Sequence, residues 1–517
     1  MSFFTEGVKL NINLTLKIGQ FIQIQFNFAL QILKCLQQNF INFKQHIMFE
    51  VFGSLSSGLA IAFVACLIMV FFFEFVNGFH DTANAVATVI YTKSLEPMHA
   101  VVWSGMWNFL GVIFSSFLGL EVAMKIANLL PVEAIMAQDP SHSAAMVLAV
   151  LLGAIIWNLG TWYLGIPCSS SHTLIGSLLG VGLVFSTLPE NQAKVGVNWG
   201  EASKIGSALL FSPLFGFSMA IVLMFVLRSV ITGENKKGIF KEPEADAKPP
   251  LWIRGILITT CTLVSFFHGQ NDGQKGIGIL MIALMTFAPM QYSLSPNFDV
   301  QKVQATLTHI QNALPTADPN NQFAPKELKI TSETIELLKQ DIANMGDMKS
   351  RLSIRKRINI LSKNMKTLIE EPNIITDAKM RKEIKSEVKA LTNYTHYAPF
   401  WAIGLISVAL GLGTMIGWKR IVVTIGEKIG KRHMTYAEGA TAEIIAASTI
   451  ALSTQFGLPV STTHVLSSGV AGAMVASKGT KNLQRGTIAN IALAWVLTLP
   501  ATIILSGGLY MLFRMFA

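Results

Sequence analysis

Long apolar runs separated by short polar stretches fill the chain from about residue 54 to its C-terminal end. Eight runs approach the roughly 20 residues that a helix needs to cross a bilayer, and they lie near residues 54–77, 99–120, 143–165, 203–228, 252–268, 398–418, 438–456 and 486–513. Four shorter runs, interrupted by Gly and Ser, lie near 79–92, 167–187, 272–290 and 459–477. The continuous runs favour helices over alternating membrane strands. The pattern predicts an all-α polytopic membrane protein of about 10–12 segments, some of them broken or re-entrant.

Two regions depart from this pattern. Residues 291–397 are polar, with apolar residues at helical spacing in "KELKITSETIELLKQDIANM", so they predict a helical extramembrane insertion. Residues 1–47 are rich in Gln, Asn, Ile and Phe and are too polar for the apolar core of a signal peptide. Two alternatives stay open for them: translation begins at Met48, or the segment is an interfacial helix on the membrane.

Two motifs occur twice, in the same order. The stretch "GFHDTANAVA" from Gly78 aligns with "GQNDGQKGIG" from Gly269, and "GIPCSSSHTLIGSLLGVGL" from Gly165 aligns with "GLPVSTTHVLSSGVAGAMV" from Gly457. Internal repetition of this kind is typical of secondary transporters, which bind substrate where two inverted-topology repeats meet. The repeats predict six regions, which are an extension at 1–47, a first repeat at 48–228, a basic cytoplasmic linker at 229–251, the start of the second repeat at 252–290, the insertion at 291–397 and the remainder of the second repeat at 398–517.

Composition agrees with a membrane protein and argues against two other classes. The 517 residues are 51% hydrophobic and 14% charged, with a mean hydropathy of +0.49. The net charge of +10 is concentrated in short loops at 228–254 and 419–433. Basic loops between spans face the cytoplasm, so the charge does not indicate nucleic acid. The four cysteines form no CxxC pair, and neither a disulfide framework nor a zinc site is expected.

The Ser/Thr-His elements predict an oxyanion site. Hydroxyl side chains cap the free N–H groups at the start of a helix, where the helix dipole also attracts anions. Proline favours the first turn of a helix. Two such starts facing each other inside the membrane would surround a tetrahedral oxyanion with donors, and the alternative is that they only cap helices. The candidate phosphate ligands of this kind are Ser169, Ser170, Ser171, Ser461, Thr462 and Thr463.

The Asp elements predict the cotransported ion. Asp81 and Asp272 would repel an anion, so they suit a cation or a proton that travels with it. The alternative is that both aspartates cap broken helices. Lys275 aligns with Asn84, and our hypothesis is that its ammonium replaces one sodium ion; otherwise it snorkels to an interface.

Further titratable residues lie in or near these elements. His80, His172, His268 and His464 either relay protons or are hydrogen-bonded packing residues. Glu74, inside "FFFEFV", is either a proton site or pairs locally.

At these residues the chain resembles the inorganic phosphate transporter (PiT) family. The signature GxNDxxNA is similar to "GFHDTANA" and "GQNDGQKG", and the element P-x-S-[ST]-[ST]-H occurs twice. "IIWNLGTWY" and "HGQNDGQKGIG" are most similar to the bacterial low-affinity PitA type, and the resemblance runs from Met48 to Ala517. It implies an inverted-repeat fold, symport of inorganic phosphate with a cation, a homodimer, and for the PitA type proton coupling and transport of neutral divalent metal–phosphate complexes.

The resemblance also assigns roles to residues. It implicates Asp81, Asn84 and Asp272 in the ion and phosphate site, together with the two hydroxyl elements. From their places in the motifs we add Thr82 to the candidate phosphate ligands, and Asn271, Lys275 and His80 to the candidate residues for ion or proton coupling. His172, His464, Gln274 and Asn108 would support them. The chain departs from the common family pattern at His80, Gln274, Lys275 and Asn108, and these departures favour protons over sodium. No resident metal, cofactor or nucleic acid is expected.

The sequence therefore predicts a phosphate:proton symporter of the bacterial inner membrane and not an enzyme. Two alternatives use the same scaffold: sodium-coupled phosphate transport, and sulfate transport, which competition by excess sulfate would reveal. A passive channel would conduct phosphate without accumulating it. An intramembrane Ser/His hydrolase is disfavoured because catalysis needs one activated nucleophile and this chain has two equivalent elements.

Overall fold

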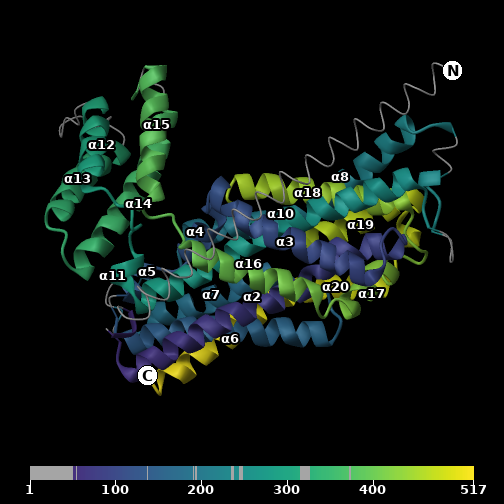
Figure 1. Ribbon diagram of the computed structural model, residues 1–517, viewed down its shortest axis with the longest axis horizontal. Coiled ribbons are helices and arrows are strands. Elements are labelled where there is room, and N and C mark those ends of the chain that lie inside the picture. The colour runs from purple at the N-terminus through teal and green to yellow at the C-terminus, as the bar shows by residue number, and fades with distance from the viewer. Residues whose placement is uncertain are drawn as a thin grey trace, which may run out of the picture.

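The computed structural model describes residues 51–517 apart from 54, 137, 190, 192–194, 234–237, 244–247, 315–325, 372–373 and 376. The described residues form helices, with one isolated bridge between Gly430 and Leu483. A bundle of long helices makes up most of the molecule, and a smaller group of helices projects from one end (Figure 1). The predicted extension at 1–47 lies outside the described residues.

The bundle contains ten helices among the described residues. They are α2 (Ser57–Tyr91), α3 (Pro97–Leu118), α6 (Pro140–Tyr163), α7 (Ser170–Thr187), α8 (Trp199–Val230), α10 (Leu251–Phe287), α16 (Phe400–Met415), α18 (Tyr436–Gln455), α19 (Thr462–Lys478) and α20 (Arg485–Arg514). Short helices join them, namely α4 (Glu121–Ala127), α5 (Val132–Met136), α11 (Pro289–Tyr292), α17 (Lys419–Glu427) and the 3₁₀ turn η1 (Thr480–Asn482). In the described part of the chain, seven helices are long and apolar enough to cross a membrane, and α16 with α17, bent by 65°, adds an eighth if the pair is one span.

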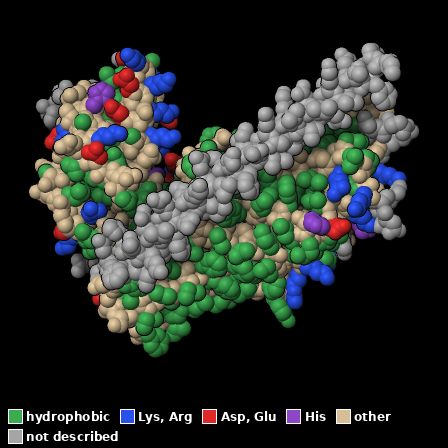
Figure 2. Space-filling model, viewed as in Figure 1, with side chains coloured by type: hydrophobic (Ala, Val, Ile, Leu, Met, Phe, Trp, Pro, Cys, Tyr) green, Lys and Arg blue, Asp and Glu red, His purple; other side chains and the backbone are tan. Residues whose placement is uncertain are grey.

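The outer surface of the bundle is apolar. Ile61, Val496 and Ile504 are 72%, 71% and 75% exposed, and the space-filling view shows a continuous hydrophobic face over the bundle (Figure 2). An exposed apolar surface of this extent marks contact with lipid. The all-α, multi-pass membrane fold predicted from the hydrophobic pattern is confirmed.

The two halves of the chain pack in an exchanged way. Helix α2 packs against α16 and α10 against α3, while α7 packs against α20 and α19 against α8. In the aligned repeats, α2 corresponds to α10, α3 to α16, α7 to α19 and α8 to α20. Each of these helices therefore packs against a helix of the other repeat: α2 against the equivalent of α3, and α7 against the equivalent of α8. This exchange is what a two-fold relation between the halves produces.

Matched helices run in opposite directions. Arg254 at the start of α10 donates to the carbonyl of Ser94, just after the end of α2, at 2.7 Å, so these two long helices are antiparallel. The first turns of α7 and α19 meet, with the rings of His172 and His464 4.5 Å apart. Both relations agree with inverted repeats, and the orientation of the repeats relative to a membrane stays a prediction.

The Asp elements lie in continuous helices, so the alternative in which both aspartates cap broken helices is wrong. Asp81 and Asp272 sit inside the continuous helices α2 and α10, which merge the runs predicted at 54–77 with 79–92 and at 252–268 with 272–290. The carboxylates are satisfied by side chains, from α7 and α19 for Asp81 and from Lys275 of the same helix for Asp272, so the backbone need not open to supply N–H donors. Capping by the aspartates is excluded for the same reason. The helical structure is interrupted instead before α7 and α19, where the chain is extended.

The insertion forms its own small helical body. Its helices are α12 (Val300–Ala313), α13 (Lys326–Ala343), α14 (Met348–Glu370) and α15 (Ala378–Asn393), packed around an apolar core that includes Leu307, Ile335 and Ile358. Because α10 is continuous, the insertion and the basic linker lie at opposite ends of the bundle (Figure 1). A cytoplasmic linker would therefore place the insertion on the other side of the membrane.

A buried arginine anchors the insertion to the bundle. Arg355 is 2% exposed and donates to the carbonyl oxygens of Ser293 at 3.1 Å and Thr395 at 2.7 Å, which lie at the two ends of the insertion, where it joins the bundle. Burial, and then the Arg355 charge, lower the pKa of His396 to about 3. The junction thus holds one positive charge and a neutral histidine.

Glycines allow the exchanged helices to cross closely. A Cβ on Gly111 in α3 would lie 2.1 Å from the carbonyl oxygen of Phe266 in α10. At the matching position of the other half, a Cβ on Gly413 in α16 would lie 2.1 Å from the carbonyl oxygen of Phe75 in α2. Only a residue without a side chain fits at either crossing. The repeat symmetry therefore extends to the backbone contacts that hold α2 and α10 in place.

We expect Gly111→Ala and Gly413→Ala each to destabilise the protein by about 1–3 kcal/mol, because the added methyl group must push two helix backbones apart. Thermal melting of the detergent-purified variants measures the effect. Gly160→Ala is the control, since a Cβ there meets nothing within 4 Å. Equal melting temperatures for all three variants would contradict the close crossing.

Candidate functional site

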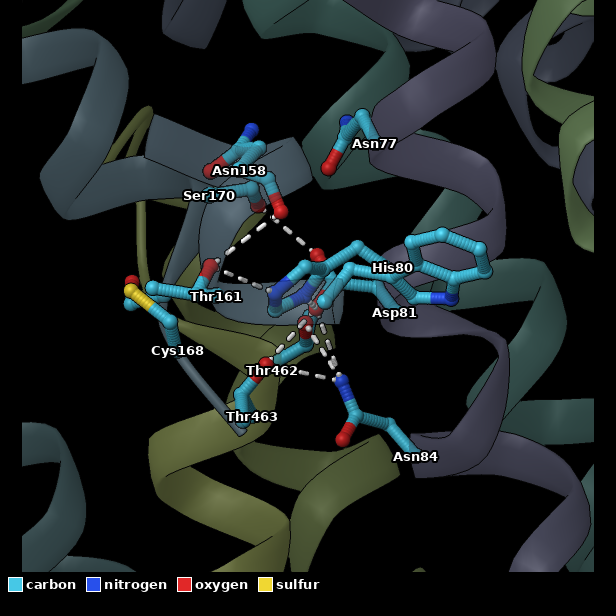
Figure 3. A network of polar contacts seen from close by, with 12 residues as sticks. Asn77, His80, Asp81, Asn84, Asn158, Thr161, Cys168, Ser170, Thr462 and Thr463 are labelled. Atoms are coloured by element: carbon cyan, nitrogen blue, oxygen red, sulfur yellow. Dashed lines mark hydrogen bonds and ion pairs between the residues drawn. The ribbon is translucent and has the colours of Figure 1, made fainter. Parts of the chain in front are cut away.

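Asp81 lies where the first turns of α7 and α19 meet, near the middle of the bundle. Its carboxylate is 2% exposed and accepts hydrogen bonds at 2.7 Å from Ser170 of α7 and at 2.7 Å from Thr463 of α19 (Figure 3). One residue from each Ser/Thr-His element thus contacts the same aspartate. The structure brings together the three motifs that the sequence singled out separately.

Asn84 lies one turn after Asp81 and reaches the same cluster. Its amide nitrogen donates to Asp81 at 3.2 Å, to Thr463 at 2.9 Å and to Thr462 at 3.4 Å (Figure 3). The i,i+3 spacing on α2 places both polar side chains on one face. Asn84 therefore joins the oxyanion element of the second repeat to the aspartate of the first.

The two hydroxyl elements begin their helices in the same way. Ser169 is the N-cap of α7 and accepts from the backbone N–H of His172 at 3.2 Å, and Ser461 caps α19 through His464 at 3.2 Å. The sequence analysis expected Pro167 and Pro459 in the first turn of each helix, but the structure places them before it. Each lies two residues before the cap, in the extended segment that its fixed φ angle suits.

Asp272 is paired with Lys275, one turn later on α10. The ammonium lies 2.7 Å from the Asp272 carboxylate and also donates to Ser171 at 2.5 Å and to the carbonyl oxygen of Val460 at 2.9 Å. Lys275 is 2% exposed, so the snorkelling alternative is wrong. Its charge lies inside the site, between the aspartate of the second repeat and both hydroxyl elements.

His268, which the sequence analysis named among the possible proton relays, links the two aspartates. Its Nε2 lies 3.8 Å from an Asp81 oxygen and 3.6 Å from an Asp272 oxygen, and its Nδ1 lies 2.9 Å from Oδ1 of Asn108. Ligand atoms of His268, Asp81 and Asp272 lie within 4.8 Å of one another, close enough to share one proton or one small cation. The signal in the sequence was the i,i+4 spacing of His268 and Asp272.

Several predicted residues lie around the site and hold it in place. Gln274 accepts from the first backbone N–H groups of α4, and Asn271 fixes the segment before α19 through Thr454 and the backbone at 458–460. The Thr82 hydroxyl donates to the carbonyl oxygens of Gly78 and Thr414, away from the hydroxyl elements. Hence Thr82, Asn271 and Gln274 position the elements, and a direct ligand role for them stays a prediction.

The predicted histidines take different places. His80 lies 3.7 Å from the Asp81 carboxylate and 3.3 Å from the Thr161 hydroxyl. His172 contacts its own cap Ser169 at 2.8 Å, and its ring lies against that of His464, so these two pack the helix starts together.

Two buried glutamates lie near α2 on either side of Asp81. Glu74 is 0% exposed; its Oε1 accepts from Asn77 at 3.2 Å, and its Oε2 has no hydrogen-bond partner in the described part of the chain. Glu443 of α18 is also 0% exposed and accepts from Thr88 and Thr260. The sequence analysis left Glu443 out; its one signal was an acidic residue inside an apolar run.

This arrangement can bind an oxyanion together with a cation. The hydroxyls and helix starts supply donors, Lys275 supplies one positive charge, and Asp81 and Asp272 oppose it with two negative charges. An anion can enter only when a further positive charge or a proton offsets the second carboxylate. Buried charges of this kind are costly unless paired.

Comparisons with known proteins agree with this chemistry. Residues 77–506 match the profile of the Phosphate transporter family. The chain is 39% identical to the Escherichia coli "Low-affinity inorganic phosphate transporter PitB" over 90% of this chain and 99% of that protein. It is equally similar to the Escherichia coli "Low-affinity inorganic phosphate transporter PitA", at 39% identity over 90% and 99%.

More distant proteins have related names. A "Probable low-affinity inorganic phosphate transporter" of Bacillus subtilis is 29% identical over 88% of this chain and 98% of that protein. A solved structure titled "The sodium-dependent phosphate transporter" is similar in fold, with a TM-score of 0.51 and 20% identity over 88% of this chain and all of that chain. These names describe transporters, as the sequence analysis expected.

We expect Lys275→Met to destabilise the protein by about 3–5 kcal/mol, because it leaves Asp272 buried without its charge partner. The double variant Asp272→Asn/Lys275→Met should recover most of this loss. Thermal melting in detergent measures both. Lys204→Met is the control, since Lys204 makes an i,i+3 ion pair with Glu201 but is 57% exposed. A single Lys275 variant as stable as the control would refute the buried pair.

Proposed function

The chain belongs to the phosphate transporter family, and from that premise we propose that it is a symporter that carries inorganic phosphate with protons across the bacterial inner membrane. It is a multi-pass membrane protein with the site at the meeting point of its two halves. The observation that supports proton coupling most directly is the position of His268 between Asp81 and Asp272.

Phosphate would be held by the starts of α7 and α19. Ser170, Thr463 and Asn84 now donate to the Asp81 carboxylate. The same hydroxyls and amide can turn to a phosphate oxygen, joined by the free N–H groups of the two helix starts and their positive dipole ends. Phosphate therefore competes with Asp81 for its donors, and Asp81 must be compensated before phosphate binds.

The hydrogen bonds around Asn108 favour one tautomer of His268. Thr414 donates its hydroxyl hydrogen to the carbonyl of Leu410, so its oxygen accepts from the Asn108 amide nitrogen at 3.0 Å. The Asn108 oxygen then faces Nδ1 of His268, which must carry a hydrogen to donate to it. Nε2 is left facing the carboxylates of Asp81 and Asp272, and it attracts them only when it also is protonated.

A proton on His268 balances the site. With His268 neutral, two carboxylates oppose the single charge of Lys275, and with His268 protonated the positive and negative charges are equal. The site then accepts an anion at a smaller electrostatic cost. Other titratable groups also face this cluster. His80 lies beside Asp81, Glu74 interacts electrostatically with Asp81, Asp272 and Lys275, and His172 and His464 interact electrostatically with Lys275 and Asp81, respectively.

Lys275 supports the choice of protons over sodium. Its ammonium lies within hydrogen-bond distance of Asp272, Ser171 and the carbonyl oxygen of Val460. These oxygen ligands are of the type that suits a sodium ion. A fixed positive charge at this position removes the need for a sodium ion there, as our hypothesis for Lys275 requires.

Two further parts of the proposal rest on the family resemblance. The first is that the protein also carries phosphate as a neutral complex with a divalent metal ion. The second is that the protein works as a homodimer. In both cases the metal ion or the second copy is a partner in transport and not a resident cofactor.

We expect proteoliposomes of the purified protein to accumulate radiolabelled phosphate under an imposed proton gradient without sodium. A protonophore should abolish this accumulation. In Lys275→Asn, which copies Asn84 of the first repeat, accumulation should become dependent on sodium. Uptake by the wild-type protein only under a sodium gradient would overturn proton coupling, while transport itself would stand.

We expect Asp81→Asn and Asp272→Asn each to abolish gradient-driven phosphate uptake, because each removes a carboxylate that stabilises the proton on His268. Uptake is measured in the same proteoliposomes, with the amount of inserted protein determined in parallel. Asp139→Asn is the matched control, since Asp139 is an exposed N-cap of α6 and Asn caps equally well. Normal uptake by either site variant would sink the assignment.

A further inference from the structure

A cavity of about 620 Å³ lies away from the central site, at the end of the bundle that carries the basic linker. It lies between the end of α6 and the bent segment that leads into α17, and its lining includes Trp162, Tyr163, Lys419, Arg420, Thr424 and Lys428. Helix α17 also packs on the end of α2, where Gly426 contacts the Tyr91 ring. The cavity therefore opens on the face that the basic loops predict to be cytoplasmic.

The charges lining the cavity are all positive. Lys419, Arg420 and Lys428 line it, and no ion pair is described for any of the three. The guanidinium of Arg420 lies over the rings of Trp162 and Tyr163, 5.2 Å and 4.9 Å from their centroids, and donates to the Tyr163 carbonyl at 2.6 Å. Its position is therefore fixed, with lysines at both ends of the same short helix. We propose that this cavity binds a phosphate group, held by Lys419, Arg420 and Lys428.

The rim of the cavity is apolar. Tyr163 and Leu164 are 65% and 69% exposed, and Ile416, just before the bend, is 55% exposed. Aromatic and basic residues together with exposed apolar ones are typical of the level of the lipid headgroups. The phosphate group can therefore belong either to an anionic phospholipid, whose chains would cover the rim, or to free inorganic phosphate on the cytoplasmic side.

The matching place in the other half lacks this charge pattern. Gly119 before α4 and Gly417 before α17 both have positive φ, and two residues later stand Glu121 and Lys419, which have opposite charges. At that end Lys125 donates to the Phe456 carbonyl at 2.9 Å, and a Cβ on Gly457 would lie 2.7 Å from Cβ of Glu121. Helix α4 thus packs against the loop at Phe456 and Gly457, and the residue at its start is the acidic Glu121. The basic cavity belongs to one face only, so the repeat architecture does not account for it.

Aromatic rings separate the cavity from the central site. Trp162 lies 5.0 Å from the Phe79 ring, adjacent in sequence to His80, and its Nε1 donates to the Gly417 carbonyl at 2.8 Å. The two lysines of the cavity have no contact with the central hydroxyls or aspartates. Their replacement therefore tests the cavity without removing a ligand of the transported phosphate.

The test compares the wild-type protein with Lys419→Gln/Lys428→Gln and with Lys431→Gln/Arg432→Gln. The second variant removes equal charge from exposed positions of the same basic segment, outside the cavity. Phosphatidylglycerol is titrated into detergent-purified protein, and bound lipid is counted by native mass spectrometry. In a second series inorganic phosphate replaces the lipid, and the fluorescence of Trp162 and Trp418 in the cavity reports binding.

We expect the cavity variant to bind a phosphate group about tenfold more weakly than the other two proteins. A loss confined to phosphatidylglycerol identifies a lipid headgroup, and a loss confined to inorganic phosphate identifies the free anion; either result supports the site. Equal binding of both probes by all three proteins, with equal melting temperatures, overturns the proposal.

Discussion

The need to compensate two buried carboxylates governs the structure of this protein. A charged side chain at the centre of a membrane costs about 2.5–3.5 kcal/mol even when it can partly reach water. Asp81 and Asp272 are 2% and 0% exposed, so their partners must come from the protein. Hydroxyls of α7 and α19 serve Asp81, and Lys275 serves Asp272. Asp81 accepts hydrogen bonds from hydroxyls of both halves of the chain, whereas Asp272 is paired with a lysine of its own helix.

The exchanged packing follows from this requirement. For the starts of α7 and α19 to reach Asp81, the two helices must meet head to head in the middle of the bundle. Extended segments carry the chain there, since a continuous helix would place its N-terminus at the surface. Glycines at the crossings of α2 with α16 and of α3 with α10 let the long helices approach closely enough to enclose the site. The same packing of the two repeats thus produces both the symmetry and the polar site at the centre.

The positions at which the two repeats differ include charged residues of the site and of the cavity. Where the first repeat has Asn84, the second has Lys275, and the fixed ammonium leaves the site one positive charge short of neutrality. His268 has its Nδ1 hydrogen committed to Asn108, so its Nε2 can supply that charge as a proton. The basic cavity beside α17 is a second departure, since its counterpart position has the acid Glu121. In the proposed symporter, such differences would give the symmetric scaffold its ion preference.

The sequence by itself determined the membrane class, the repeats, the insertion and most of the site. Long apolar runs can only be helices in lipid, because backbone groups there must bond within the segment. Asp81, Asp272, the hydroxyl elements and Lys275 were identified because polar residues inside such runs, found twice, need a functional reason.

The tertiary structure alone decided which groups touch. It showed that the Asp elements are continuous helix, that Lys275 is buried, and that Thr82 turns away from the hydroxyl elements. It also placed His268 between Asp81 and Asp272 and added Glu443, whose partners Thr88 and Thr260 lie far away in the chain. The local sequence pattern indicates only that burying a polar residue such as Asp81 costs free energy. The residue that offsets this cost, such as Thr463, is brought into contact by packing between segments hundreds of residues apart.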